Sequence, residues 1–417
     1  MDTNIVKIGS GSYSTVYYYV KDGREIALKQ YDSCNRQKLG FSPDCLKDLV
    51  IYHNVVDVDI NDVEVYNNKF MLSMPYYGNN ISKLRKDLSI LDIKNVFRSV
   101  LMQLVNLHNY NIIHRDIKPH NIVYWQGFNA KLIDYSIACL SEINQKREVY
   151  TEWYRPPEIC NGCGYGKSAD VWSLGLVILE CVVDQTVLPY TNTDRTEELA
   201  ALYYYIKKMD RVGIKNLTSS TNNKYAEILK KAHSRDAELF NLIIQMISRE
   251  PHLRPTAIEC IDHHCFSGNI MLTRDRISDI YYHEFQVEYK LLKQTIEYID
   301  NKFKTIQLLA IDSARIILNS IFIVSKLKRN QSVKRLLPVA VGISAKLIYD
   351  DIEAIIYMFE FNYISELELL KTLGYDIYCY IPKTSLCEKL LRDLTDKQKQ
   401  DSKIKQLIDK IELELLI

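Results

Sequence analysis

Two short segments near the N-terminus carry residue types that could hold a phosphate group. Residues 9–14 (GSGSYS) lie between two strand-like patterns, where glycines would let backbone amides approach phosphate oxygens with no side chain between them. The next strand-like run, residues 26–29 (IALK), ends in Lys29, whose ammonium group could reach the same oxygens. An ordinary glycine-bearing hairpin explains residues 9–14 equally well when they are taken alone. The residues that follow decide between these interpretations.

A string of polar residues further along the chain narrows the chemistry. Residues 114–121 (HRDIKPHN) hold a carboxylate, a lysine and an amide in the order of a kinase catalytic loop. Residues 134–136 (DYS) follow a short apolar run, and residues 153–158 (WYRPPE) come later in the chain. This order and spacing resembles that of eukaryotic protein kinases over roughly residues 1–266. Residues 153–158 are most similar to the group that contains the cyclin-dependent and mitogen-activated kinases.

The resemblance implies an ATP- and Mg²⁺-dependent serine/threonine kinase that acts on a protein substrate. Asp116 would accept the proton of the substrate hydroxyl, and Lys118 would steady the transferring phosphate. Lys29, the third predicted catalytic residue, would reach the phosphates of the nucleotide. Asn121 and Asp134 are the implied Mg²⁺ ligands, because this ion prefers hard oxygen ligands. The positions implied to surround the nucleotide are Ile8, Gly9, Gly11, Val16, Ala27, Lys29, Met74 and Tyr76.

Three further residues match positions that have structural roles in the family. Glu158 and Arg254 match the buried ion pair that braces the helical lobe of a kinase. Asp170 matches the residue that holds the catalytic loop from beneath. These matches predict hydrogen bonds within the protein and imply no contact with substrate.

Several positions depart from the kinase pattern. Ser14 replaces the third glycine of the loop, and Ser136 replaces the glycine of the metal-binding segment. Asp48 stands where a glutamate is expected to pair with Lys29, and aspartate is one methylene shorter. The alternative for Asp48 is an exposed helix residue that takes no part in the site. Together these departures leave a rival from a different class, a pseudokinase scaffold that binds nucleotide or partners without phosphoryl transfer.

Strands and helices must position these residues. Up to about residue 74 the sequence alternates like short strands, and one helical stretch interrupts them at residues 44–53. From about residue 93 onward, apolar residues recur at three- and four-residue steps, which is typical of helices. This pattern predicts a small sheet lobe that carries one helix, followed by a larger helical lobe, and the resemblance implies that the fold class is the α+β bilobal kinase fold. The predicted strands are residues 5–8, 16–20, 25–30, 63–66 and 70–73.

The chain continues beyond the expected kinase domain of residues 1–266. We expect a linker at residues 267–274, an all-α domain at residues 275–394 and a C-terminal helix at residues 395–417. The all-α domain is predicted because helical periodicity continues there while the chemistry-bearing motifs stop.

Part of this helical region resembles a cyclin box. The resemblance rests on residues 336–346 (LLPVAVGISAK) and on the acidic helix pattern of residues 365–377. Lys346 and Glu366 match the pair that, in cyclins, holds the regulatory helix of the kinase. The resemblance implies a cyclin-dependent kinase fused to its own activating cyclin-like domain, which would dock within the chain or across a homodimer. A generic helical extension, with Lys346 as a surface charge, is the alternative.

Composition limits the classes of partner. The chain has 417 residues, of which 47% are hydrophobic and 25% charged, so it is neither a single small module nor a disordered chain. Lys plus Arg number 53 against 52 Asp plus Glu, which gives no global bias toward nucleic acid or anionic membrane. The sequence shows no secretory signal and no apolar run long enough to span a bilayer. We therefore expect an intracellular protein, cytoplasmic or nuclear, with no nucleic-acid or membrane partner.

Overall fold

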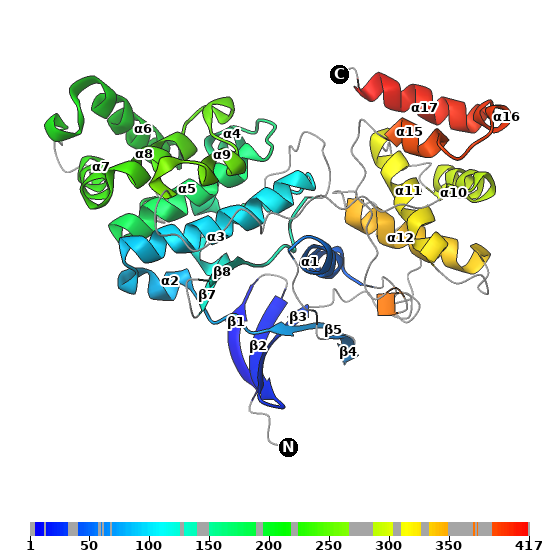
Figure 1. Cartoon of the computed structure of the whole chain (residues 1–417), viewed down its shortest axis with the longest axis horizontal. Helices are drawn as coiled ribbons and strands as arrows, with labels where there is room; N and C mark the ends of the chain where they lie inside the picture. The colour runs from blue at the N-terminus through cyan, green and yellow to red at the C-terminus, as the bar shows by residue number, and fades with distance from the viewer. Residues whose placement is uncertain are drawn as a thin grey trace. The chain divides into compact units, whose positions relative to one another are not determined.

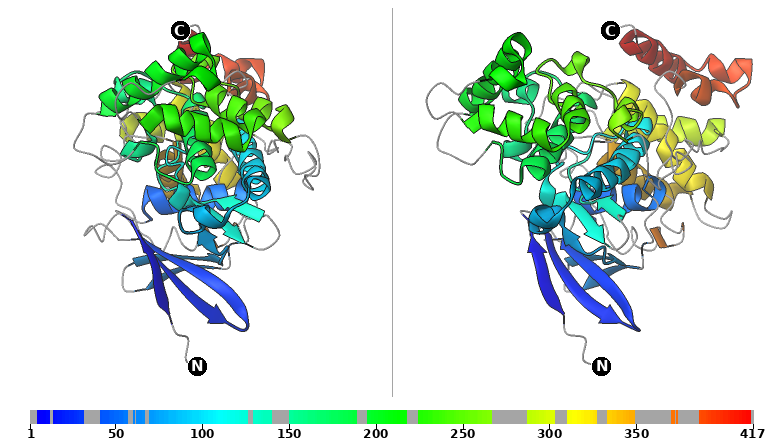
Figure 2. Two further views of the ribbon diagram at one scale, coloured as in Figure 1. Left: turned by 90° about the vertical axis from the view of Figure 1, so that its left-hand side faces the viewer. Right: turned by 60° about the vertical axis from the view of Figure 1, so that its left-hand side comes forward.

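The chain folds into two compact units (Figures 1 and 2). Unit 1 contains Met1–Tyr76, Cys139–Glu142 and Ile280–Ile417, and unit 2 contains Tyr77–Ala138 and Ile143–Asp279. In the described residues no helix has the length and apolar character needed to cross a membrane. The computed structural model describes residues 5–11, 14–31, 41–56, 60, 62–66, 69–125, 129–139, 150–188, 195–217, 224–266, 287–302, 310–326, 333–348, 370, 371, 373 and 386–415.

Unit 1 begins with a five-stranded antiparallel sheet in the order β1-β2-β3-β5-β4. Asp22 and Gly23 join β2 to β3 and have φ angles of 52° and 74°. Two successive positive φ angles are what a tight two-residue hairpin turn requires, and Asp-Gly adopts them readily. All five predicted strands are confirmed. They are β1 (Val6–Ser10), β2 (Ser14–Lys21), β3 (Arg24–Tyr31), β4 (Asp62–Tyr66) and β5 (Lys69–Pro75).

The single helix of the sheet region, α1 (Pro43–Asn54), is buried on nearly all of its faces. Its first turn is capped by Ser42, whose side chain accepts a hydrogen bond from the backbone N–H of Cys45 at 3.2 Å. Pro43 follows at the first helical position, where its missing N–H is not needed. A helix that is buried all round must be covered from more than one side. In unit 1, α1 packs against β5 and also against α12 (Val333–Ile348) (Figure 1).

The rest of unit 1 consists of helices from the C-terminal part of the chain. Helix α11 packs against α12, and it also contacts α10 and α17. Asn319 on α11 donates to the hydroxyl of Ser344 on α12 at 3.0 Å, so these two buried polar side chains satisfy each other. The helices predicted around residues 311–328 and 333–349 are confirmed, whereas the linker at residues 267–274 lies outside the described residues. Besides α12, the helices are α10 (Tyr289–Lys302), α11 (Ala310–Lys326), α15 (Leu386–Leu391), α16 (Asp396–Lys399) and α17 (Ser402–Leu415).

Unit 2 is mainly helical and is built around α5 (Ser168–Val183), which is almost fully buried. A Cβ atom at Gly175 would lie 2.7 Å from the Cβ of Met246, so the glycine allows α5 and α8 to approach closely. Helix α3 (Ile90–Asn109) begins with a capping box formed by Ser89 and Asp92. The remaining elements are β6 (Asn79–Asn80), β7 (Ile122–Trp125), β8 (Asn129–Leu132), α2 (Ile81–Leu84), α4 (Pro157–Cys160), α6 (Arg195–Val212), α7 (Lys224–Arg235), α8 (Ala237–Met246) and α9 (Ala257–Ile261).

The order of elements confirms the predicted sequence of a small sheet with one helix followed by a larger helical region. The three short strands of unit 2 form a separate antiparallel sheet in the order β6-β7-β8. This sheet positions two parts of the candidate site. The catalytic loop ends where β7 begins, at Ile122, and the segment with Asp134 begins where β8 ends, at Leu132.

Candidate active site

Strand pairing in unit 1 brings the predicted nucleotide residues to one face of the sheet. Val16 on β2 lies opposite Lys29 on β3, and Ala27 lies opposite Met74 on β5. Lys29 and Ala27 are two residues apart on one strand, so their side chains point to the same face. All four side chains therefore share that face, with a small alanine between the two larger apolar residues. A flat apolar surface of this kind, with an ammonium group beside it, fits a purine nucleotide.

The described residues of the predicted glycine loop lie at the facing ends of β1 and β2. Gly9 pairs with Val16, and the register shifts between Lys7 and Gly9, which bends the strand there. The backbone N–H of Gly11 donates to the carbonyl of Ser14 at 2.8 Å and joins the two strand ends. Ile8, at the same strand end, is 39% exposed.

The predicted Tyr76 position lies just after β5. Its backbone N–H donates to the carbonyl of Glu25 at 3.1 Å, which continues the pairing of β5 with β3 by one residue. Its ring meets that of Tyr18 edge to face, with 4.8 Å between the centroids. The side chain is thereby held at the edge of the sheet face that carries Ala27 and Met74.

Lys29 forms a buried ion pair with Asp48 of α1, with 2.6 Å between Nζ and Oδ2. Asp48 is fully buried, so the interpretation of this residue as an exposed helix position is wrong. The hydroxyl of Tyr31 also donates to Asp48 Oδ2 at 2.6 Å. Tyr31 was not among the predicted site residues, because an aromatic residue at the end of a strand is typical of ordinary sheet packing.

In unit 2, Asp170 organises the start of the catalytic loop as predicted. Its carboxylate accepts the backbone N–H groups of His114 at 2.7 Å and of Arg115 at 3.0 Å. It also lies 3.1 Å from Nε2 of His108. Burial alone would raise the pKa of Asp170, but the hydrogen bonds from His108 and His114 outweigh it and hold the pKa below its ordinary value. The carboxylate therefore stays charged and fixes the loop backbone.

Asp116 is the centre of a hydrogen-bonded cluster of predicted catalytic residues. Lys118 Nζ donates to its Oδ2 at 2.6 Å, and the side-chain amide of Asn121 donates to the same oxygen at 2.8 Å. Thr151 joins this cluster, since its hydroxyl donates to Asp116 Oδ1 at 2.6 Å and accepts from Lys118 at 3.0 Å. Thr151 was not predicted, although it lies only two residues before the WYRPPE motif. The cluster holds the carboxylate beside a compensating ammonium group.

The two predicted metal ligands are joined through the backbone. The N–H of Ile133 donates to the carbonyl of Asn121 at 2.9 Å, which fixes Asn121 next to the segment that carries Asp134. The hydroxyl of Ser136, the residue that replaces a glycine, donates to Asp134 Oδ1 at 2.7 Å. An amide oxygen and a carboxylate are the hard ligands that Mg²⁺ prefers, so these side chains fit the ion.

Tyr150 anchors the end of the activation segment, the stretch between Asp134 and Glu158. Its φ angle is 76°, and its hydroxyl donates to Asp170 at 3.2 Å. Its ring packs edge to face on Tyr165, with 5.7 Å between the centroids. The guanidinium of Arg155 donates to the Tyr150 carbonyl at 3.3 Å. A left-handed backbone is costly for a tyrosine, and these contacts hold it there.

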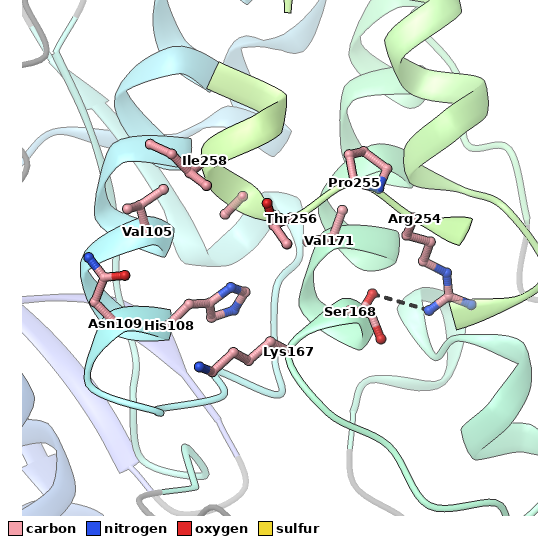
Figure 3. A pocket seen from close by; sticks show the side chains of 11 residues that line it. Val105, His108, Asn109, Lys167, Ser168, Val171, Arg254, Pro255, Thr256 and Ile258 are labelled. Carbon is pink, nitrogen blue, oxygen red and sulfur yellow. Dashed lines mark hydrogen bonds between the residues drawn. The ribbon is translucent and has the colours of Figure 1, made fainter. Parts of the chain in front are cut away.

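Unit 2 also contains a cavity of about 240 Å³, which Figure 3 shows between the end of α3, the start of α5 and the start of α9. Val105, Val171 and Ile258 supply apolar wall, and His108 lies beside them (Figure 3). At one edge, Arg254 donates to the carbonyl of Ser168 at 3.1 Å, the dashed line in Figure 3. None of the predicted catalytic or metal residues lines this cavity, so it is not the nucleotide site.

Lys346, the predicted cyclin-like contact, lies on α12 and is only 1% exposed. The alternative of a surface charge is therefore wrong for this side chain. Burial and the charge of Asp48 raise the pKa of the Cys45 thiol on α1 well above its ordinary value, and the charges of Lys29 and Lys346 oppose that rise. Lys346 thus lies buried on the helix that packs against α1. Glu366, the second predicted contact, lies outside the described residues.

Comparison with known proteins gives a consistent assignment. Residues 3–266 match the family model for the protein kinase domain. Mitogen-activated protein kinase pmk-1 of Caenorhabditis elegans is 27% identical over 286 residues, which cover 62% of this chain and 74% of that protein. Cyclin-dependent kinase 1 of Encephalitozoon cuniculi is 27% identical over 284 residues, 63% of this chain and 95% of that protein.

A third relative, serine/threonine-protein kinase crk1 of Schizosaccharomyces pombe, is 25% identical over 286 residues, 63% of this chain and 83% of that protein. The family model covers more than half of the chain, and all three relatives are named as kinases. Members of this family use ATP and Mg²⁺ and act on proteins. The chain therefore belongs to the protein kinase family and is a protein serine/threonine kinase.

Proposed function

We propose that this kinase transfers the terminal phosphoryl group of Mg·ATP to serine or threonine hydroxyls of a protein substrate, with Asp116 as the base. The observation that carries the proposal is the cluster of Lys118, Asn121 and Thr151 around the Asp116 carboxylate. A carboxylate held in this way can orient a hydroxyl and accept its proton, while Lys118 offsets negative charge nearby.

The remaining residues divide into two groups. In unit 1, the face that carries Val16, Ala27 and Met74 would bind the adenine, and Lys29 would bind phosphate oxygens. In unit 2, Asn121 and Asp134 would hold Mg²⁺. The bound metal ion would neutralise charge on the triphosphate. Asp170 keeps the loop backbone in place and so positions Asp116.

The direct test of this function compares the full-length wild type with the Asp116→Asn variant. Both are incubated with Mg·ATP and a mixture of serine and threonine peptides, and phosphate incorporation is measured. Loss of a general base typically lowers the rate about 10²–10⁴-fold. The proposal is supported if the wild type phosphorylates the peptides and the variant is slower by this factor. Equal turnover by the two proteins contradicts the role of Asp116.

The rival interpretation, a scaffold without phosphoryl transfer, is not favoured. It was motivated in part by Asp48 and Ser136. Asp48 nonetheless makes an ion pair with Lys29, and Ser136 contacts Asp134 without removing its carboxylate. Both departures therefore keep the charged groups that the chemistry needs.

We also propose that the C-terminal helices act as a cyclin-like activator that is part of the same chain. Support comes from the packing of α12 against α1 and from the buried Lys346 near Cys45, three residues before Asp48. A domain that covers α1 would hold Asp48 beside Lys29. Tethering it replaces association between two molecules by an effective concentration of about millimolar.

Lys346→Met tests the activator, because it keeps the length of the side chain and removes its charge. We expect a lower kcat, measured by phosphate incorporation into a peptide substrate with the full chain. Lys293→Met on α10 is the matched control. Lys293 also belongs to unit 1, and its ion pair is with Asp401 rather than with a residue of α1. A chain that ends at residue 266 and keeps full activity would contradict the activator.

We also propose a preference for proline after the phosphorylated residue, which the resemblance to the cyclin-dependent and mitogen-activated kinases implies. By the same resemblance, Tyr150 lies near the site that receives this residue. The Tyr150 carbonyl already accepts from Arg155, so it is engaged within the protein. A substrate residue with an N–H would gain nothing from this carbonyl, whereas proline has no N–H to satisfy. Paired peptides that differ only in proline or alanine after the serine test this preference.

A further inference from the structure

Two side chains converge on one buried carboxylate oxygen in unit 1. Tyr31 ends β3 two residues after Lys29, so the two side chains point to the same face of the sheet. The Tyr31 hydroxyl and the Lys29 ammonium each donate to Asp48 Oδ2, both at 2.6 Å. Tyr31 is 1% exposed and Asp48 is 0% exposed, so water does not compete for this oxygen.

The contact between Tyr31 and Asp48 has the properties of a charge-assisted hydrogen bond. Its length of 2.6 Å falls in the range for a hydroxyl that donates to a carboxylate. Burial and then the charge of Asp48 raise the pKa of Tyr31 well above its ordinary value, so the phenol keeps its proton and acts as the donor. The Lys29 ammonium also lies 5.2 Å from the centroid of the Tyr31 ring, within cation–π distance. Tyr31 therefore contacts both members of the ion pair.

The length of the acidic side chain explains why a third group is present. The kinase pattern expects glutamate at position 48, and aspartate reaches one methylene less far. The tyrosine hydroxyl occupies the space next to the aspartate carboxylate, and a contact of 2.6 Å leaves no room there for a longer acid. The aspartate carboxylate and the tyrosine hydroxyl together thus occupy the space that a glutamate side chain would need.

We propose that Tyr31 is a positioning residue for phosphoryl transfer. Tyr31 and Asp48 act as one unit that takes the place of the expected glutamate and holds Lys29 where it binds the nucleotide phosphates. This inference rests on the proposed role of Lys29 in nucleotide binding. Tyr31 itself touches neither substrate nor nucleotide in this account, because it acts through Asp48 and Lys29.

The aromatic ring of Tyr31 is held independently of its hydroxyl. Tyr31 lies opposite Phe70 on β5, and Phe70 stacks on Phe41 with 4.1 Å between the ring centroids. Phe41 precedes α1, so this aromatic cluster connects the sheet with the beginning of the helix. Tyr31→Phe therefore removes the hydroxyl and leaves the packing in place.

The first experiment compares full-length wild type and Tyr31→Phe in steady-state kinetics and in binding of Mg-free ADP by calorimetry. We expect kcat/KM for ATP to fall about tenfold, the size expected for one charge-assisted hydrogen bond, and ADP to bind more weakly. The matched control is Tyr203→Phe in unit 2. It removes a buried hydroxyl that contacts Trp172 at 2.9 Å and Ile247 at 3.0 Å, and it should leave kcat/KM for ATP unchanged.

A rescue experiment separates positioning from general packing. Asp48→Glu alone should lower activity, because the longer acid meets the Tyr31 hydroxyl. Tyr31→Phe combined with Asp48→Glu should be more active than either single variant. The proposal is overturned if the loss of activity in the double variant equals the sum of the losses in the two single variants. It is also overturned if Tyr31→Phe shows wild-type kinetics and unchanged ADP binding. If the proposed function itself is wrong, wild type and Asp116→Asn are equally inactive, which is a different result.

Discussion

Two buried ion pairs, one in each unit, are built in different ways. In unit 2, the five N–H groups of Arg254 each have an acceptor. They donate to both carboxylate oxygens of Glu158, at 2.7 and 2.8 Å, and to the carbonyls of Ser168, Ser248 and Arg249, at 3.1, 2.8 and 3.1 Å. This arrangement fixes the orientation of both side chains.

In unit 1, Lys29 and Tyr31 both donate to the same carboxylate oxygen of Asp48. An ammonium group on a flexible stem can keep one contact while it turns toward a second anion, whereas a bound arginine fork cannot. Both pairs are buried, so burial does not distinguish a structural brace from a working pair. The arrangement of donors differs between them, which supports a structural role for Arg254 and the ligand-binding role that we propose for Lys29.

The largest expected effect is the loss of the brace in unit 2. Arg254→Ala leaves the Glu158 carboxylate buried without its partner, which should lower the free energy of unfolding by about 3–5 kcal/mol. Urea denaturation of the full chain measures the change. The double variant Arg254→Met with Glu158→Leu removes both charges and should recover most of that stability. A stable Arg254→Ala protein would show that the five hydrogen bonds do not brace the unit.

Exchanging arginine and lysine in both ion pairs tests whether one pair serves stability and the other serves activity. Arg254→Lys cannot serve the same acceptors, so we expect lower stability with unchanged kcat/KM in the folded fraction. Lys29→Arg keeps the charge but needs a wider contact than one shared oxygen offers, so we expect kcat/KM for ATP to fall about tenfold or more. Denaturation and kinetics on both variants check the two outcomes. Equal effects on stability would remove the distinction between the pairs.

Sequence motifs predicted the candidate site residues, but they did not reveal all contacts between them. Lys29, Asp116 and Asp134 were predictable because kinase motifs keep a fixed order along the chain. Thr151 was not, since its contact with Asp116 depends on how a segment 35 residues away folds back. Tyr31 was missed because strand periodicity places its side chain on a face without showing where the hydroxyl ends.

The fold was predictable to a similar extent. Alternating patterns identified the five strands, and helical periodicity identified α11 and α12. The packing of α12 on α1 joins residues far apart in the sequence, and local patterns carry no information on such contacts. The one local sign was α1 itself, whose Cys45 and Leu49 are apolar on one side while Leu46 and Val50 are apolar on another. A helix with two apolar sides needs two neighbours.

A smaller effect is expected at Ser136, which contacts a metal ligand rather than an ion pair. Its hydroxyl donates to Asp134 Oδ1, and such outer contacts orient the ligand. Ser136→Ala should raise the Mg²⁺ concentration needed for half-maximal activity severalfold, and direct titration with Mn²⁺ should show weaker binding. Ser136→Thr keeps the hydroxyl and is the control. Unchanged metal affinity in Ser136→Ala would mean that the hydroxyl plays no part in holding Asp134.

The smallest expected effect is a pH dependence of stability from His114 in the catalytic loop. Burial lowers the pKa of His114 below its ordinary value, although the charges of Asp170, Asp116 and Asp134 partly oppose this. Its Nδ1 accepts the backbone N–H of Asp116 at 3.2 Å, so the folded protein holds the neutral ring.

The unfolded chain takes up a proton near the ordinary histidine pKa of about 6.5, before the folded protein does. The stabilising contribution of the neutral His114 is therefore present above this pH and is lost as the pH falls toward the folded pKa. His120 and His263 are shifted in the same direction, so the wild type alone does not isolate His114. Thermal unfolding between pH 8 and 5 should show a shallower decline for His114→Gln than for wild type. Parallel curves would contradict this role, because glutamine does not titrate and the other two histidines remain.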